Sequence, residues 1–287
     1  MRSRYLLRHV NGFVVSMLAG LVAALGGGDE STSRRDALEA RSLVVPVLMY
    51  HHIREPGPTM RDRLSQRFAV SPAEFAKQLD YLQRHGFTTI NCDQLAAALY
   101  EGGELPPKPI MLTFDDAWRE QYTIAFPLLK SRGMVGVFYV HTGVVGDDPD
   151  RGYATWADLC EMYEAGMDIQ SHTITHPSLP GVEPAKLDDE LQASKATIER
   201  VLGAECISIA YPFGDFTERE MRAAARAGYR FAFTTEVGLV HDVSQPYEIG
   251  RTIVTYTDTL DDFAIKLAEL DGGRALLDYR PSITRQK

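Results

Sequence analysis

The sequence predicts an α/β fold in which short parallel strands alternate with helices around a closed or nearly closed barrel, a distorted (β/α)7–8 arrangement of the TIM type. Three observations support this prediction. Short apolar runs recur along the chain, capped helical segments lie between them, and seven or eight such units fit into roughly 230 residues. The same alternation also allows an open, doubly wound sheet.

The candidate strands are rich in apolar and β-branched residues without strict alternation. This pattern is typical of parallel strands that are buried on both faces. Strands are expected at residues Val44–Met49, Thr88–Ile90, Ile110–Phe114, Val135–Val140, Asp168–Ser171, Ile207–Tyr211, Phe231–Thr234 and Ile253–Thr255.

Helices are expected between these strands. The segment Ser71-Pro72-Ala73-Glu74 is a capping box with proline at the first helical position, and it begins a helix that ends near Gly86. A similar start at Thr155 predicts a helix that ends near Gly166. Further helices are expected at about Pro184–Leu202, Thr217–Ala227 and Leu260–Leu270.

Composition limits the possible partners. The chain has 287 residues, a formal net charge of −9 and a pI near 5.4. This acidity argues against nucleic acid, because phosphate binding needs clustered Lys and Arg. The cysteines Cys92, Cys160 and Cys206 are odd in number and widely spaced, so we expect no disulfide framework and no catalytic cysteine.

The N-terminus predicts export. Arg2, Arg4 and Arg8 precede a run from Gly12 to Gly28 that contains no charge. We therefore expect a signal peptide or membrane anchor over 1–28, a polar linker over 29–43, one catalytic domain over 44–271 and a polar tail over 272–287. The choice between cleavage and anchoring stays open. Either outcome places the domain in the periplasm, outside the cell, or on the outer side of the cytoplasmic membrane.

Polar clusters follow four of the expected strands. Asp115 and Asp116 follow one strand, His172 begins the next cluster, His51 and His52 form a third, and Tyr211-Pro212-Phe213-Gly214 a fourth. The carboxyl ends of barrel strands meet at one face, so these side chains should lie close together.

Each cluster has a plainer interpretation by itself. Adjacent aspartates often cap a helix, a His-x-x-x-His pair is a weak metal signal, and the Pro/Gly segment suits a turn. Their shared position at the strand ends favours a joint site. Two histidines and one aspartate can hold a catalytic divalent cation, and the second carboxylate is then available as a general base.

These motifs resemble those of the NodB-homology polysaccharide deacetylases, carbohydrate esterase family four. Thr113–Ala117 resembles the family's T-F-D-D-G with alanine in place of glycine, Ser171–His176 resembles H-[S/T]-x-x-[H/N], and Ala210–Gly214 resembles A-Y-P-[F/Y]-G. Met49–Ile53 and Arg251–Val254 are most similar to motifs of the exported poly-N-acetylglucosamine deacetylases. The resemblance extends over roughly Val44 to Tyr256.

The resemblance implies a role for each site residue. Asp116, His172 and His176 would hold the metal ion, with zinc expected first and nickel or cobalt also suited to the ligands. Asp115 would accept a proton from metal-bound water, and the backbone N–H of Tyr211 would stabilise the oxyanion. His51 would protonate the leaving amine.

Several assignments keep alternatives. Arg251 is expected to orient Asp115, or else to be an ordinary surface arginine. His52 and His241 are rival acids: strand alternation would point His52 away from the site, and His241 is expected in a loop. Trp156 could pack at its helix start or stack on a sugar. Ala117 suggests that the turn after Asp116 avoids positive φ.

The function implied by the resemblance is metal-dependent removal of N-acetyl groups from a cell-surface or exopolysaccharide similar to poly-N-acetylglucosamine. The expected partner is that polysaccharide, with membrane contact only through the N-terminal segment. An O-deacetylase or peptidoglycan deacetylase with the same site is an alternative, and a non-catalytic sugar-binding module is another.

Overall fold

A computed structural model describes residues 42–55, 67–238, 240–242 and 244–270. The expected signal peptide or anchor over 1–28 and the tail over 272–287 lie outside these residues. The linker expected over 29–43 also lies outside them, except that strand β1 begins at Ser42. Within the described ranges, none of the helices combines the length and apolar character that a membrane crossing requires.

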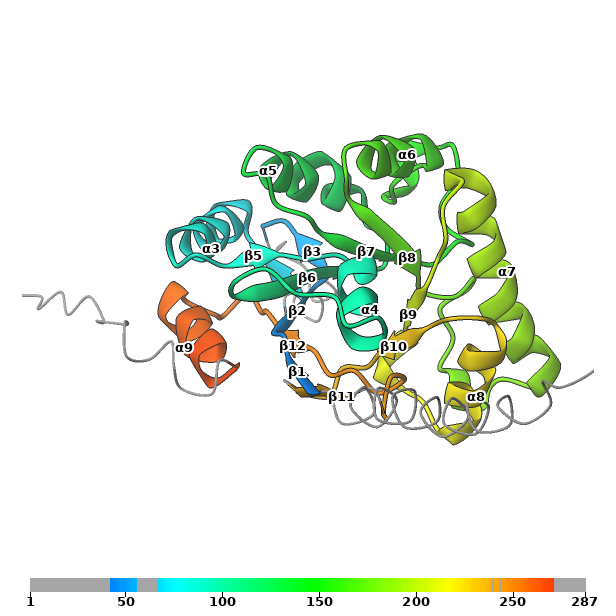
Figure 1. Ribbon diagram of the computed structural model, residues 1–287. Coiled ribbons are helices and arrows are strands. Elements are labelled where there is room, and N and C mark those ends of the chain that lie inside the picture. The colour runs from blue at the N-terminus through cyan, green and yellow to red at the C-terminus, as the bar shows by residue number, and fades with distance from the viewer. Residues whose placement is uncertain (1–41, 56–66, 239, 243, 271–287) are drawn as a thin grey trace, which may run out of the picture. The chain divides into compact units, whose positions relative to one another are not determined.

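The central sheet is parallel throughout its eight strands. Along its main path the order is β10-β9-β8-β7-β6-β2-β12, and β5 pairs with the beginning of β6 (Figure 1). The strands are β2 (Val47–Tyr50), β5 (Thr88–Thr89), β6 (Pro109–Asp115), β7 (Val137–Val140), β8 (Asp168–Ser171), β9 (Ser208–Ala210), β10 (Phe231–Phe233) and β12 (Thr252–Ile253). All eight expected strands are therefore present, most of them shorter than expected.

Backbone contacts link the two ends of this path. Phe233 of β10 forms an isolated parallel bridge with Ile249, and the chain then enters β12, which pairs with β2. The Thr234 N–H donates to the Ile249 carbonyl at 2.9 Å. The strands thus follow one another around a distorted (β/α) barrel, which confirms the expected fold class rather than the open sheet.

Two small sheets lie beside the barrel strands. Strand β1 (Ser42–Val44) pairs antiparallel with β11 (Val240–Asp242), and β3 (His52–Ile53) pairs with β4 (Ala69–Val70). His241 therefore lies in a strand, not in the expected loop.

The predicted helices are present with nearly the expected bounds, and Figure 1 shows most of them outside the strands. Ser71 caps α3 through its hydroxyl, and Thr155 and Thr217 form capping boxes at α6 and α8. The helices are α3 (Pro72–Arg84), α6 (Trp156–Glu164), α7 (Pro184–Leu202), α8 (Glu218–Arg226) and α9 (Leu260–Leu270). Short 3-10 turns lie at Pro149–Arg151, Leu179–Gly181 and Pro212–Gly214.

Two helical segments were not expected. Helix α4 (Cys92–Tyr100) begins at a capping box between Asn91 and Gln94, a signal that the sequence does contain. A π-helical turn at Gln121–Ala125 runs directly into α5 (Phe126–Lys130). The π turn depends on its tertiary surroundings, so the local sequence contains no signal that predicts it.

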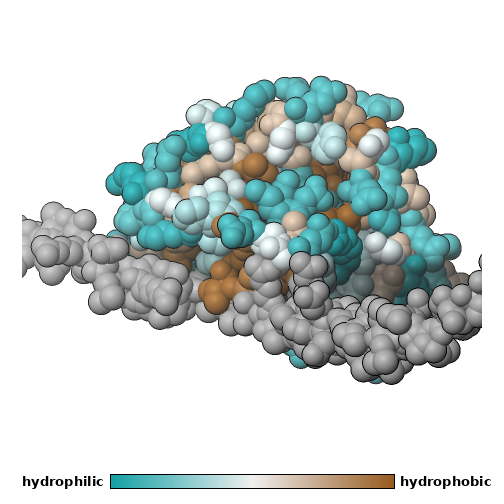
Figure 2. Space-filling view, in the orientation of Figure 1, coloured by the Kyte–Doolittle hydropathy of each residue, from teal (hydrophilic) through white to brown (hydrophobic). Residues whose placement is uncertain are grey.

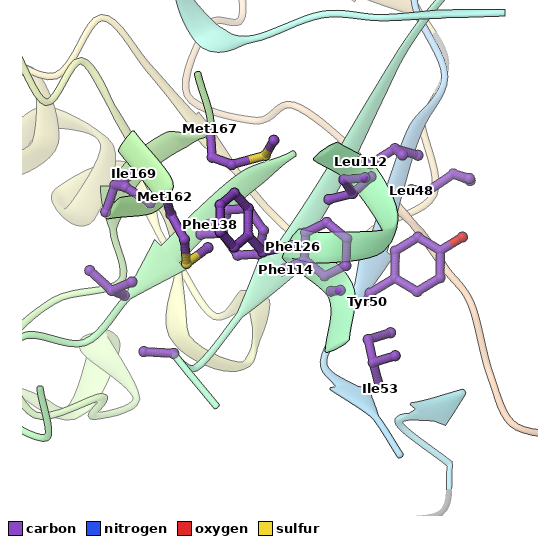
Figure 3. Packing of buried hydrophobic residues seen from close by; sticks show 14 of the residues in the cluster. Leu48, Tyr50, Ile53, Leu112, Phe114, Phe126, Phe138, Met162, Met167 and Ile169 are labelled. Atoms are coloured by element: carbon purple, nitrogen blue, oxygen red, sulfur yellow. The ribbon is translucent and has the colours of Figure 1, made fainter. Parts of the chain in front are cut away.

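Apolar side chains cover both faces of the strands. On the helix-facing side, Phe114 stacks on Phe138 at 4.7 Å and on Tyr50 at 5.3 Å between ring centroids (Figure 3). A second cluster joins Val47, Tyr139 and other strand residues to Leu95 and neighbouring residues of α4. This two-sided burial explains why the strands lack apolar-polar alternation. In Figure 2 hydrophilic residues cover much of the visible surface, with smaller apolar patches between them.

Candidate active site

A pocket of about 470 Å³ opens at the carboxyl ends of the barrel strands. A second cavity among the described residues, of about 330 Å³, lies elsewhere and shares none of its lining. The four polar clusters expected from the sequence all contribute to it. Its lining consists of Met49, His51, His52, Arg67, Phe68, Asp115, Asp116, His172, His176, Tyr211, Phe213, Thr235 and Ile253.

Asp116, His172 and His176 converge on a common point. One ligand atom from each lies within 4.8 Å of the others. The Asp116 Oδ1 atom is 3.6 Å from His172 Nε2 and 3.4 Å from His176 Nε2, and the two Nε2 atoms are 3.1 Å apart. A single cation could contact all three atoms at this separation.

The protonation of His172 suits metal binding. Its Nδ1 lies 2.7 Å from the Ala210 carbonyl, an acceptor, so Nδ1 carries the proton and Nε2 presents its lone pair to the cluster. Burial lowers the pKa of His172 to about 4, which keeps the ring neutral at physiological pH. This donor set fits a divalent ion such as Zn²⁺, Ni²⁺ or Co²⁺ with positions left for other ligands.

Asp115 forms a bidentate ion pair with Arg251. The two guanidinium terminal nitrogens donate to the two carboxylate oxygens, each at 2.7 Å. Arg251 is fully buried and Asp115 is 2% exposed, so Arg251 is not a surface arginine. Burial alone would raise the pKa of Asp115, but Arg251 and, less strongly, His172 hold this pKa well below its usual value. Asp115 is therefore ionised at neutral pH.

His51 enters the pocket beside these carboxylates. Its ring packs on Phe68 with centroids 4.9 Å apart, and its buried Nδ1 has no hydrogen-bond partner among the described residues. Burial lowers the pKa of His51, although the negative charges of Asp115 and Asp116 act to raise this pKa.

His52 is not directed away from the site as strand alternation suggested. It also lines the pocket, and its Nδ1 lies 2.7 Å from Glu120 Oε1. Its ring packs on Trp118 with centroids 4.3 Å apart. The regular alternation fails here because β2 ends at Tyr50 and a second short strand, β3, begins at His52.

The expected oxyanion donor is already occupied. The Tyr211 N–H donates to the Phe233 carbonyl at 2.9 Å, which removes it as a donor to substrate. Sequence reasoning missed this because the bond joins β9 to β10 across the sheet. The Phe213 N–H, two residues further on, has no acceptor in the described part of the chain, and Phe213 lines the pocket and is 62% exposed.

The turn after Asp116 does adopt positive φ, contrary to the expectation from Ala117. The φ of Asp116 is 80° and that of Ala117 is 59°. Hydrogen bonds hold this conformation, from the Asp116 N–H to the Tyr139 carbonyl and from the Ala154 N–H to the Ala117 carbonyl. Thr173, His176 and Phe213 also have positive φ. Such backbone strain gathers at functional sites, where surrounding contacts maintain it.

Two buried polar residues that the sequence analysis missed hold the site loops. Glu190 of α7 accepts the N–H groups of Ile174 and Thr175 at 2.8 and 2.9 Å, which fixes the loop between the two histidines. Gln121 of the π turn donates to the carbonyls of His51 and Asp115 at 2.8 and 2.5 Å. An isolated Glu or Gln within a helical pattern gives no signal of such a role.

His141 is a further missed histidine. It follows β7, and its ring lies 5.6 Å from that of His176. Burial lowers the pKa of His141 to about 4. Its position at a strand end was a usable signal, because the other site residues share it.

The remaining candidates lie elsewhere. Trp156 packs against the hydrophobic core at the start of α6, as its plainer interpretation predicted. Cys92 and Cys206 are buried, and all three cysteines are free thiols.

Comparison with known proteins identifies the family. Residues 102–232 match the family model described as polysaccharide deacetylase. The Bacillus subtilis (strain 168) protein YxkH, named as a polysaccharide deacetylase, is 28% identical over 211 residues, which cover 74% of this chain and 71% of YxkH. The poly-β-1,6-N-acetyl-D-glucosamine N-deacetylase of Staphylococcus epidermidis is 25% identical over 79% of this chain and 83% of its own length.

Solved structures agree with these sequence relatives. The Streptococcus pyogenes deacetylase PplD, solved in complex with acetate, superposes with a TM-score of 0.72 at 26% identity, over 79% of this chain and 99% of PplD. IcaB from Ammonifex degensii gives a TM-score of 0.65 at 26% identity, over 79% of this chain and 96% of IcaB. The chain therefore contains a polysaccharide deacetylase domain of the NodB-homology type, carbohydrate esterase family four, and these similarities indicate a deacetylase enzyme.

Proposed function

We propose that this protein removes N-acetyl groups from an exported or cell-surface polysaccharide similar to poly-N-acetylglucosamine, and that it needs a divalent cation to do so. The observation that carries the proposal is the convergence of Asp116, His172 and His176 beside the ion-paired Asp115. The named activity of the Staphylococcus epidermidis relative favours the N-acetylglucosamine polymer. The uncharged N-terminal run supports export.

Asp116, His172 and His176 would hold the cation, which when bound would polarise the acetamide carbonyl and lower the pKa of water. Asp115 is the general base. Arg251 keeps it ionised and fixes its plane, while each oxygen retains a second lone pair. The low pKa of Asp115 disfavours its protonated form, so Asp115 should give up the proton that it takes from water and return to its ionised state.

Two other groups complete the chemistry. We assign oxyanion stabilisation to the Phe213 N–H in place of Tyr211, because the Tyr211 N–H is engaged and the Phe213 N–H is not. His51 is assigned as the general acid. It lies in the same pocket, and its Nδ1 has no hydrogen-bond partner among the described residues. An amine leaves poorly until it is protonated, so the reaction requires such an acid.

Acetate release from N-acetylglucosamine oligomers tests the proposal. Wild-type protein should release acetate, a chelator should abolish release, and Zn²⁺, Ni²⁺ or Co²⁺ should restore it. Asp115→Asn and His176→Ala should each remove most turnover. Asp93→Asn should not, because Asp93 is an exposed carboxylate at the opposite end of the barrel.

Substrate comparison separates the alternatives. O-acetylated sugars and peptidoglycan should be offered beside the β-linked oligomers under the same conditions. Faster release from either would replace the proposed substrate. Sugar binding without turnover of any acetylated substrate would support a non-catalytic module and contradict the proposal.

A further inference from the structure

One oxygen of Asp116 is not directed at the two histidines. While Oδ1 lies near both Nε2 atoms, Oδ2 accepts a hydrogen bond from the indole Nε1–H of Trp118 at 3.1 Å. The two oxygens of the carboxylate therefore have different partners. A carboxylate held in this way can offer one oxygen to a cation while the other stays occupied.

Two aromatic rings pack against the Trp118 ring. Tyr153 stacks on it at 4.8 Å with an interplanar angle of 20°, and His52 packs on it at 4.3 Å. An isolated antiparallel bridge also joins the backbones of Trp118 and Tyr153. His52 is itself fixed by its contact with Glu120. The indole thus has little freedom to rotate away from Asp116.

Trp118 does not belong to the set of described residues that line the pocket, so it is placed to act through Asp116 and not on substrate. A phenylalanine could still pack against Tyr153 and His52, because both contacts are made by the aromatic ring and not by its N–H. It could not donate to Oδ2. The hydrogen bond is therefore the part of the contact that needs tryptophan.

We infer that Trp118 is a positioning residue that holds Asp116 as a single-oxygen ligand, with Tyr153 and His52 keeping the indole in place. This inference rests on the cation-binding role proposed for Asp116. Loss of the N–H would free Oδ2 to rotate toward the cation or into water. Hydrogen-bond partners of metal ligands typically change metal affinity by about 10- to 100-fold when they are removed.

The test compares metal affinity in Trp118→Phe and Trp156→Phe, the second being a matched control because Trp156 packs against the core outside the site. Zn²⁺ affinity is measured by competition with a chromophoric chelator, and the visible spectrum of the Co²⁺-loaded protein reports the coordination. No substrate is needed. We expect Trp118→Phe to weaken Zn²⁺ binding by about 10- to 100-fold and to alter the Co²⁺ spectrum, while Trp156→Phe leaves both unchanged.

A substitution that keeps the shape of the side chain tests whether the effect of Trp118→Phe comes from misfolding. A further variant combines Trp156→Phe with Trp118→benzothienylalanine, which replaces only the indole N–H of residue 118 by sulfur. This variant should show the same loss of Zn²⁺ affinity as Trp118→Phe. Zn²⁺ affinity within twofold of wild type in this protein, with an unchanged Co²⁺ spectrum, overturns the inference about Trp118. Wild-type protein that binds no stoichiometric Zn²⁺ would instead overturn the metal site itself.

Discussion

Replacing Arg251 by methionine should show how much the buried ion pair between Arg251 and Asp115 contributes to stability. Arg251 is fully buried, and it donates to both oxygens of Asp115 at 2.7 Å. It also donates from Nε to the Thr234 carbonyl at 3.0 Å. Methionine fills a similar volume but offers no donor, so Arg251→Met leaves the Asp115 charge buried and unpaired.

The expected cost follows from that geometry. Removing one partner of a buried ion pair typically destabilises a protein by about 3–5 kcal/mol, mostly through the desolvated charge that is left behind. With a urea m-value of about 2 kcal/mol/M, the unfolding midpoint should fall by roughly 2 M. The double variant Arg251→Met with Asp115→Asn should recover much of this loss, since no buried charge remains.

The pH dependence gives the sharper test. In wild-type protein the pKa of Asp115 lies below its usual value, so Asp115 contributes stability above that usual pKa and loses it as pH falls. Without Arg251, burial should raise the pKa above the unfolded value. The folded variant would then bind a proton that the unfolded chain does not, and its stability should rise as pH falls from 7 toward 5 relative to wild type.

The assay is urea unfolding of metal-free protein, followed by circular dichroism at pH 7 and pH 5. Acetate release by the single variant should also fall sharply at pH 7, because Asp115 loses the two hydrogen bonds that orient it and its ionised form becomes less stable. A midpoint within about 0.3 M of wild type at pH 7, roughly half a kcal/mol, would refute the reasoning. So would a penalty that does not shrink at pH 5.

Three further predictions concern strain, histidine burial and oxyanion binding. Ala117→Gly should stabilise the protein by up to about 1 kcal/mol in urea unfolding, because glycine adopts the φ of 59° without strain; a loss of stability would contradict the strain argument. Burial lowers the pKa of His141 and His172 from 6.5 to about 4, so between these pH values the unfolded chain binds protons that the folded chain does not. The free energy of unfolding of metal-free protein should therefore fall with pH, by about 1.4 kcal/mol per pH unit for each histidine. His141→Gln should reduce this slope; an equal slope would show that His141 does not contribute to the pH dependence. An amide-to-ester exchange, with phenyllactic acid in place of Phe213, removes the proposed oxyanion N–H and keeps a backbone that can adopt the φ of 62°; it should lower kcat at least tenfold, while Phe213→Ala retains the donor. Equal kcat values in the two variants would count against the assignment.

The local sequence was enough to predict most of the elements. Apolar runs identified every barrel strand because these strands are buried on both faces, and capping residues such as Ser71 and Thr155 located helix starts. Helix α4 was missed although Asn91 and Gln94 form a capping box, so that omission was avoidable. The π turn was not predictable in the same way, because its register depends on contacts with distant strands.

The candidate site, too, was predictable from the sequence only in part. The sequence by itself determined which residues follow the strands, and the parallel arrangement then required Asp116, His172 and His176 to approach one another. Only the tertiary structure decided how each polar group is used. It paired Arg251 with Asp115, engaged the Tyr211 N–H with β10, and placed Trp118 against Asp116. The physical reason is that strand periodicity fixes where a residue emerges, whereas hydrogen-bond partners are set by atoms that lie far apart in the chain.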